Sequence, residues 1–254
     1  MSFLKIQNLN ISYKISGQGQ KILLLHGWGT DLSYFNDLVK LLVADEFQVV
    51  AVDLPGFGRS DSLDQGWSVD DYADFTNEFI NNLNINDCYL LGHSFGGRIG
   101  IKLAAGQPDW LKGLILVNSA GLKPRKTFKR IIFQIIAKAG KLFFSLPLLS
   151  KLQSSFKKFL YRLAGEQDYL QSTGIMKETF KKVIAEDLKP VLPQIKLKTL
   201  IVWGKNDTFT PLADGQTLNK LIKNSRLIIV DNVGHNLPRT RPADLIEPIK
   251  DFIR

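Results

Sequence analysis

A serine flanked by glycines, in the pentapeptide Gly92-His93-Ser94-Phe95-Gly96, is the first feature of this sequence that could carry out chemistry. The apolar run at 88–91 predicts a strand before it, and residues 97–105 predict a helix after it. In a G-x-S-x-G turn between a strand and a helix, the serine sits on a sharp bend that exposes its hydroxyl. Ser94 is therefore the candidate nucleophile, although the motif alone also fits a glycine-rich turn without chemistry.

A serine nucleophile needs a base within hydrogen-bond reach, and the base needs an acid that orients it. In strand-turn-helix serine enzymes the chain order is Ser, then Asp or Glu, then His. Among the three histidines, His235 is the only one that follows Ser94, and it lies after the last predicted strand. His93 is fixed inside the turn and His26 begins another turn, so both are predicted to have structural roles.

The acid is predicted to be Asp207, just past the strand expected at 199–204. That position lies at the carboxyl edge of the sheet, where ligands bind in open α/β folds. Asp231, at the end of the next strand, and Asp214, within the following helix, are the competing carboxylates. The turn after an earlier strand could also hold the acid, but there the chain has Asn118 and no carboxylate.

Acyl transfer also needs backbone N–H groups that stabilise the negative charge on the carbonyl oxygen. One donor is expected to be the N–H of Phe95, directly after the nucleophile. The second is expected to be the N–H of Trp28, since residues 26–29 follow a predicted strand and precede a helix. A plain strand-to-helix turn would also explain the glycines at 27 and 29.

Apolar runs alternate with amphipathic stretches on both sides of the middle of the chain, which predicts parallel βαβ units with helices on both faces of a sheet. The fold class is therefore α/β, with a mostly parallel central sheet. Residues 10–15 alternate at period two and predict an added antiparallel edge strand. Strands are expected at 22–26, 48–53, 88–91, 114–117, 199–204 and 226–230, and helices at 33–44, 69–83, 97–105, 212–223 and 244–252.

The middle of the chain differs from the rest in pattern and in charge. From residue 121 to residue 198 no strand is expected, and helical periodicities are interrupted by prolines and glycines. Residues 122–198 contain 17 Lys and Arg against 5 Asp and Glu, a net of +12, which leaves −3 of the total of +9 for the rest. This local basicity argues against a chain that binds nucleic acid along its whole length.

The composition fits a globular protein, with 44% hydrophobic and 22% charged residues. The amino terminus lacks a signal-peptide pattern, and no run approaches the roughly 18 apolar residues that span a bilayer, so we expect a soluble, cytoplasmic protein. Cys88 is the only cysteine, which excludes an internal disulfide and a thiolate cluster. With three histidines and no metal-binding spacing, neither a metal nor a cofactor is expected.

Five segments carry a family resemblance: His26-Gly27-Trp28-Gly29, Asp53-Leu54-Pro55-Gly56-Phe57-Gly58-Arg59-Ser60, Gly92-His93-Ser94-Phe95-Gly96-Gly97, Trp203-Gly204-Lys205-Asn206-Asp207 and Gly234-His235. In this order they resemble the α/β-hydrolase superfamily over nearly the whole chain. The resemblance implies a core of residues 1–120 and 199–254 and a helical cap of residues 121–198 that covers the site. Epoxide hydrolases and haloalkane dehalogenases look similar, but they carry Asp as the nucleophile where this chain has Ser94.

We therefore expect a serine hydrolase that cleaves carboxylic esters through an acyl-enzyme on Ser94. The apolar side chains between residues 131 and 149 favour an apolar acyl or aryl group in the substrate. The basic residues between 129 and 158 are either solvated, in weak contact with an anionic membrane surface, or docked to an acidic partner protein. The same triad could cleave a lactone, an amide, a thioester or a carbon–carbon bond, or run perhydrolysis. A hydrolase-fold receptor with vestigial turnover and a non-catalytic membrane-surface module are the alternatives from other classes. The sequence does not indicate an oligomeric state.

Overall fold

The computed structural model describes residues 1–123 and 174–254. The cap expected over residues 121–198 lies mostly outside the described residues, and the division into core and cap stays a prediction. Within the described ranges, none of the helices has the length and hydropathy that a membrane-spanning segment needs.

The described residues form a sheet of eight strands in the order β1-β2-β4-β3-β5-β6-β7-β8. The strands from β4 to β8 in this order pair in parallel, as expected from the alternation of strands and helices. The bounds are β1 Ser2–Ile6, β2 Leu9–Ser16, β3 Gln20–Leu25, β4 Phe47–Val52, β5 Cys88–His93, β6 Leu111–Val117, β7 Thr199–Gly204 and β8 Ser225–Val230. All six strands expected in the parallel part are therefore present, with ends that shift by a few residues.

The antiparallel end of the sheet differs from the sequence prediction. Strand β2 is antiparallel, as predicted for residues 10–15, but it lies between β1 and β4 and is not the edge. The edge strand is β1, which the sequence pattern did not predict. Only Ile6 of this strand is buried, so β1 lacks the run of apolar residues that marks the inner strands.

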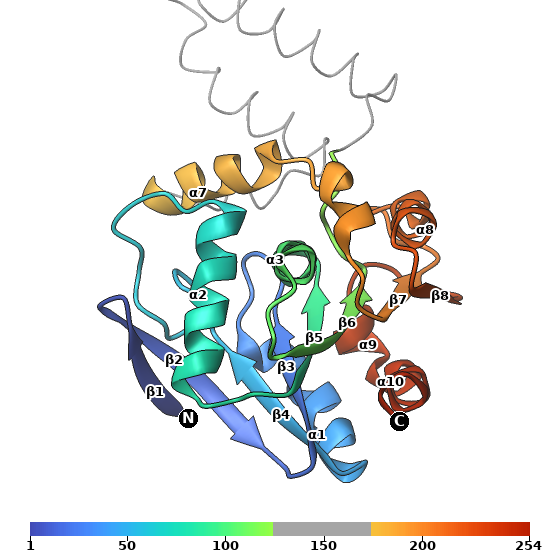
Figure 1. Cartoon of the computed structure of the whole chain (residues 1–254), viewed down its shortest axis with the longest axis horizontal. Coiled ribbons are helices and arrows are strands. Elements are labelled where there is room, and N and C mark those ends of the chain that lie inside the picture. The colour runs from blue at the N-terminus through green and yellow to red at the C-terminus, as the bar shows by residue number, and fades with distance from the viewer. Residues whose placement is uncertain (124–173) are drawn as a thin grey trace, which may run out of the picture.

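Helices cover both faces of the sheet (Figure 1), with α2 and α3 on one face and α1 and α10 on the other. The helix expected at 33–44 is divided, because a 3-10 turn precedes α1, and a similar turn precedes α10. The helices are η1 Leu32–Phe35, α1 Asn36–Ala44, α2 Val69–Asn82, α3 Phe95–Gly106, α7 Gly174–Ala185, η2 Lys189–Gln194, α8 Leu212–Leu221, α9 Leu237–Thr240, η3 Pro242–Leu245 and α10 Ile246–Ile253.

Each face of the sheet has its own apolar core. Side chains of α2, α3 and α8 pack on one face with Trp203, and those of α1 and α10 pack on the other with Phe35. Because the parallel strands are buried on both faces, they are read in the sequence as continuous apolar runs. Because these strands are parallel, their carboxyl ends lie at the same edge of the sheet. The loops that follow β3, β5, β6, β7 and β8 come together at that edge.

Helix α7 lies across the end of α2 at which α2 begins (Figure 1). Thr179 of α7 is fully buried and its hydroxyl accepts the backbone N–H of Trp67 at 3.1 Å. Lys182 donates to the carbonyl of Gly66 at 2.7 Å, and Val183 is buried in the apolar core. This helix is therefore a fixed wall beside the edge of the sheet that carries the candidate site.

Candidate active site

Ser94 occupies the sharp turn between β5 and α3 that the sequence predicts. Its φ of 51° and ψ of −110° lie in a region that residues with a side chain rarely adopt. A Cβ on Gly96 would lie 2.0 Å from the carbonyl oxygen of Leu25, and one on Gly92 would lie 2.4 Å from that of Gly96. The two glycines are required because strand β3, strand β5 and helix α3 approach each other at this turn.

The structure brings Ser94, His235 and Asp207 into one hydrogen-bonded chain. Ser94 Oγ lies 3.0 Å from His235 Nε2, and His235 Nδ1 lies 2.8 Å from Asp207 Oδ2. Residues from three loops thus meet although 141 positions separate Ser94 from His235. A proton on Nδ1 of His235 leaves Nε2 free to accept the hydroxyl proton of Ser94, which is the arrangement that activates a serine.

The loops of the acid and the base are tied by their backbones. The N–H of Asn206 donates to the carbonyl of Val233 at 2.9 Å, and that of Lys205 to the carbonyl of Val230 at 2.9 Å. Asp207 and His235 follow these paired segments directly. The separation between carboxylate and imidazole is therefore set by neighbouring parallel strands.

The carboxylate of Asp207 is buried and held by five donors. Oδ1 accepts the N–H groups of Phe209 and Thr210 at 2.8 and 2.9 Å, and Oδ2 accepts the hydroxyl of Thr210 at 2.7 Å. The imidazole of His235 and the amide of Asn118 also donate to Oδ2. Burial raises the pKa of Asp207, but the hydrogen bonds and the electrostatic interaction with His235 outweigh it, so the pKa lies below its ordinary value.

Asn118 is a site residue that sequence reasoning noted only for lacking a carboxylate. It directly follows β6, and its φ of 46° turns the chain toward the acid loop. Its amide donates to Asp207, while its side-chain oxygen accepts the N–H of Gly204 at 3.3 Å. Its position after the strand beside β7 is the signal that could have identified it, but this needs the strand order of the sheet.

The two predicted oxyanion donors, Phe95 and Trp28, lie on loops that are joined by a backbone hydrogen bond. The N–H of Gly96 donates to the carbonyl of His26 at 3.0 Å. The carbonyl of Gly27 accepts His26 Nδ1–H at 2.8 Å and the hydroxyl of Thr30 at 2.9 Å. In a trans peptide the next N–H points opposite to the carbonyl, so these bonds fix the direction of the Trp28 N–H.

His26 is fully buried, and both of its ring nitrogens have backbone partners. Nε2 accepts the N–H of Leu54 at 3.0 Å, while Nδ1 donates to Gly27. Burial lowers the pKa of His26, so the ring is neutral and keeps this tautomer. Both ring nitrogens of His26 therefore bind the backbone of neighbouring loops, and neither is hydrogen-bonded to Ser94 Oγ.

His93 is likewise held away from the nucleophile. Its Nδ1 donates to the carbonyl of Val117 at 3.0 Å, and Nε2 accepts the hydroxyl of Tyr34 at 3.1 Å. Burial and the neighbouring His235 lower the pKa of His93 to about 3. A neutral ring therefore packs 4.9 Å from the ring of His235.

The competing carboxylates lie elsewhere. Asp231 is exposed and forms an ion pair with Lys205 at 2.7 Å. Asp214 lies in the first turn of α8. Of the three aspartates considered, the structure brings Asp207 to His235.

A pocket of about 370 Å³ opens onto Ser94 and His235. Its described walls combine apolar and polar side chains, and helix α7 supplies three of the apolar ones. Around the nucleophile the apolar lining residues are Trp28, Phe95, Ala120, Phe180, Val183, Ile184 and Phe209.

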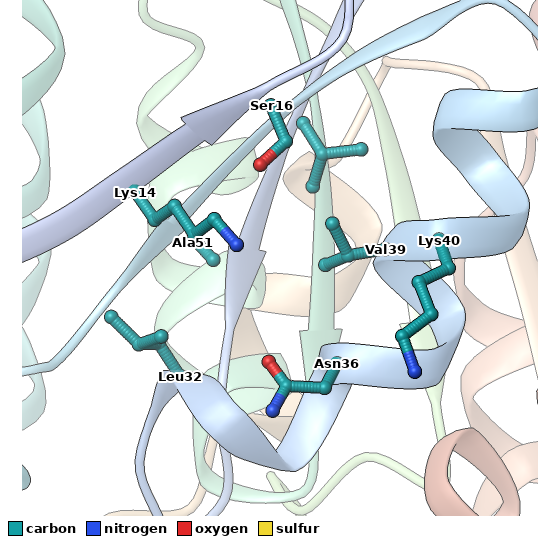
Figure 2. A pocket seen from close by; sticks show the side chains of 8 residues that line it. Lys14, Ser16, Leu32, Asn36, Val39, Lys40 and Ala51 are labelled. Carbon is teal, nitrogen blue, oxygen red and sulfur yellow. The ribbon is translucent and has the colours of Figure 1, made fainter. Parts of the chain in front are cut away.

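A second hollow, of about 270 Å³, lies between β2, β4 and α1 (Figure 2). Lys14, Ser16, Asn36 and Lys40 supply its polar groups, and Lys40 is already paired with Asp37 at 2.7 Å. No member of the Ser94, His235 and Asp207 chain lines it. The candidate active site is therefore the pocket over Ser94.

The chain is similar to bacterial hydrolases. A 2-hydroxy-6-oxononadienedioate/2-hydroxy-6-oxononatrienedioate hydrolase of Pseudomonas putida is 28% identical over 258 residues, which cover 92% of this chain and 89% of the relative. A hydrolase of the same description from Escherichia coli is 28% identical over 249 residues, covering 90% of this chain and 85% of the relative.

Solved structures share the fold. An esterase from Exiguobacterium antarcticum superposes with a TM-score of 0.77 at 23% identity, covering 99% of this chain and 98% of that chain. An enol-lactonase from Burkholderia xenovorans gives a TM-score of 0.74 at 21% identity, covering 99% of each. The family model described as the alpha/beta hydrolase fold matches residues 21–242. The chain therefore belongs to the α/β-hydrolase family.

Proposed function

We propose that this protein is a serine hydrolase that cleaves carboxylic esters through an acyl-enzyme on Ser94. The observation that carries the proposal is the continuous hydrogen-bonded chain from Ser94 Oγ through His235 to Asp207. The oxyanion donors in this proposal are the N–H groups of Phe95 and Trp28.

Acylation begins when Ser94 Oγ attacks the ester carbonyl carbon and its proton passes to His235 Nε2. The carbonyl electron pair moves onto oxygen, where Phe95 and Trp28 N–H groups stabilise the charge. When the tetrahedral intermediate collapses, the bond to the alcohol oxygen breaks and His235 returns the proton to the leaving alcohol. Asp207 keeps Nδ1 of His235 protonated and stabilises the imidazolium.

Deacylation repeats these steps with water as the nucleophile. Water loses a proton to His235 and attacks the acyl carbon, and Ser94 Oγ leaves with that proton. The products are the carboxylic acid and the alcohol, and the enzyme returns to its starting state.

The described walls of the pocket support an apolar acyl or aryl group in the substrate. Phe180, Val183 and Ile184 of α7 face the same pocket as Ser94. An apolar group placed there would gain roughly 25 cal/mol per Å² of surface removed from water.

Carbon–carbon bond hydrolysis is the second candidate, because the two relatives named above are hydrolases of 2-hydroxy-6-oxo dienedioates and trienedioates. The same triad is also compatible with cleavage of a lactone, an activated amide or a thioester, and with perhydrolysis. The contact with an anionic membrane or an acidic partner that we expect for the basic residues of 122–198 concerns a segment that lies mostly outside the described residues.

The test is a panel of p-nitrophenyl esters of increasing acyl length, assayed with the wild type, Ser94→Ala and Ser62→Ala. Ser62 is exposed, so Ser62→Ala is the matched control. We expect repeated turnover by the wild type and by Ser62→Ala, and a loss of about 10⁴-fold or more in kcat for Ser94→Ala. A fluorophosphonate should label Ser94. Undiminished esterase activity of Ser94→Ala would refute the proposal, and a single slow turnover would favour a receptor.

A further inference from the structure

We propose that Arg98 binds an anionic group of the substrate, so that the preferred ester carries a carboxylate at the end of its acyl chain. This inference rests on the proposed function of the same site. It narrows the substrate class from apolar esters to esters that combine an apolar chain with an acid.

Arg98 lies one helical turn after the nucleophile. The N–H of Arg98 donates to the carbonyl of Ser94 at 3.2 Å, and Arg98 is one of the residues that line the pocket over Ser94. Arg98 is only 4% exposed. The guanidinium is therefore withdrawn from bulk water, and it belongs to a residue that borders the space a substrate would fill.

Arg98 is the single Lys, Arg, Asp or Glu among the described residues that line this pocket. Its neighbours in the wall include Val183 and Ala120. Burial lowers the pKa of Arg98 to about 10, which still leaves the guanidinium protonated at neutral pH. A cation beside an apolar wall attracts an anion more strongly than an exposed cation does, because the local dielectric constant is lower.

The described surroundings leave this charge without a directly paired carboxylate. Arg98 donates through one terminal nitrogen to the backbone carbonyl of Glu186 at 2.8 Å. The carboxylate of Glu186 instead accepts Lys102 at 2.8 Å, and that of Asp187 accepts the N–H groups of Lys123 and Lys189.

In residues 1–123 and 174–254, no ion pair joins Arg98 to an acid. A guanidinium has five N–H donors in a planar fork that matches the two oxygens of a carboxylate. Among the described residues the guanidinium donates to one neutral carbonyl, that of Glu186, which leaves further donors that a substrate carboxylate can use.

Arg98 also connects α3 to the segment after α7, and a purely structural role must be separated from a role in binding. Lys102 provides the control, because it forms a similar connection. It lies one turn further along α3, pairs with Glu186 and with Asp70 at 2.8 Å, and does not line the pocket. Replacing Lys102 removes an ion pair with Glu186, in the same segment, without removing a charge from the pocket.

The experiment compares two esters of equal chain length, p-nitrophenyl hexanoate and mono-p-nitrophenyl adipate, after subtraction of spontaneous hydrolysis. We expect the wild type to prefer the adipate monoester in kcat/KM by about 10-fold or more. Arg98→Gln should reduce that preference by roughly 10- to 100-fold, mainly through KM, as for a charge-assisted hydrogen bond. Arg98→Lys should retain part of the preference, and Lys102→Gln should leave the ratio of the two esters as it is.

The wild-type comparison needs no variant to fold. Equal or better hydrolysis of the hexanoate ester by the wild type would overturn the inference, as would a ratio that stays the same in a folded Arg98→Gln variant. If the preference for the adipate monoester falls equally in Lys102→Gln, the effect belongs to the connection with Glu186, and this result would also overturn the inference.

A binding measurement separates this inference from the proposed function. Titration calorimetry with monomethyl adipate and dimethyl adipate, on Ser94→Ala with and without Arg98→Gln, requires no turnover. Tighter binding of the monoacid that depends on Arg98 supports the inference even if neither ester is hydrolysed. Equal binding of the two compounds contradicts it even if both esters are good substrates.

Discussion

Asn118 donates its side-chain amide to Oδ2 of Asp207, the same oxygen that accepts the Nδ1 proton of His235. Strand β6 therefore helps to orient the acid although the acid itself follows β7. An amide at this position donates a hydrogen bond to the carboxylate, whereas a second carboxylate would repel it.

Removing the Asn118 side chain should slow the proposed reaction. Asn118→Gly tolerates the φ of 46° but removes one donor from Asp207. We expect kcat to fall about 10-fold with little change in KM, since a hydrogen bond to a charged group contributes about 1.5–3 kcal/mol. Asn8→Gly is the matched control, because Asn8 has a φ of 68° in an exposed turn. Equal kcat values for the two variants would contradict a role for Asn118 in positioning Asp207.

The identity of the acid can be tested with two isosteric substitutions. Asp207→Asn keeps the shape of the side chain but removes the negative charge that keeps Nδ1 of His235 protonated and stabilises the imidazolium, and we expect kcat to fall by about 10⁴-fold. Asp231→Asn removes only an exposed ion pair with Lys205 and should change kcat less than twofold. Steady-state kinetics on one p-nitrophenyl ester is sufficient. A larger loss for Asp231→Asn than for Asp207→Asn would exclude the assignment.

The turn that carries Ser94 should not tolerate a methyl group at Gly96. The added Cβ would lie 2.0 Å from a backbone oxygen of β3, and we expect Gly96→Ala to lower the free energy of unfolding by about 3 kcal/mol or more. Gly106, at the other end of α3, has nothing within 4 Å of the corresponding position. Gly106→Ala should change stability by less than about 1 kcal/mol, in the stabilising direction. Urea unfolding of both variants checks this, and similar midpoints would show that the turn can relax.

His93 predicts how stability depends on pH. Its pKa is about 3 in the folded protein and 6.5 in the unfolded chain, so protons bind mainly to the unfolded state below pH 6.5. The neutral ring makes its full contribution to the free energy of unfolding above pH 6.5. This contribution falls as the pH drops toward 3, by on the order of 2 kcal/mol for each decrease of 1.5 pH units. His93→Gln should flatten this dependence between pH 5 and pH 7. Parallel stability curves for wild type and variant in urea unfolding would contradict the prediction.

The sequence predicted the parallel part of the fold because its strands are buried on both faces. Leu23, Leu90 and Ile201 are each fully buried, and their strands appear as apolar runs. Strand β1 was missed because only one of its side chains, that of Ile6, is buried. Its sequence therefore has no apolar pattern that distinguishes a strand from a loop.

The candidate triad was also predictable in part, since chain order and strand ends indicated Ser94, Asp207 and His235. Their roles in catalysis stay predictions, but the distances between them are those that catalysis needs. Asn118 and Arg98 could not be identified as site residues in the same way. Hydrogen bonding to Asp207 depends on the order of β6 and β7 in the sheet, and burial of an arginine on a helix depends on what packs over it.

Cys88, at the start of β5, is fully buried, and burial raises the pKa of its thiol to about 12. A thiol in this state does not react with disulfide reagents while the strand is in place. Because it is the only cysteine in the chain, its rate of labelling measures a single event, the opening of the central strand that leads to Ser94. The labelling rate of Cys88 therefore reports local unfolding of β5, the strand that positions Ser94.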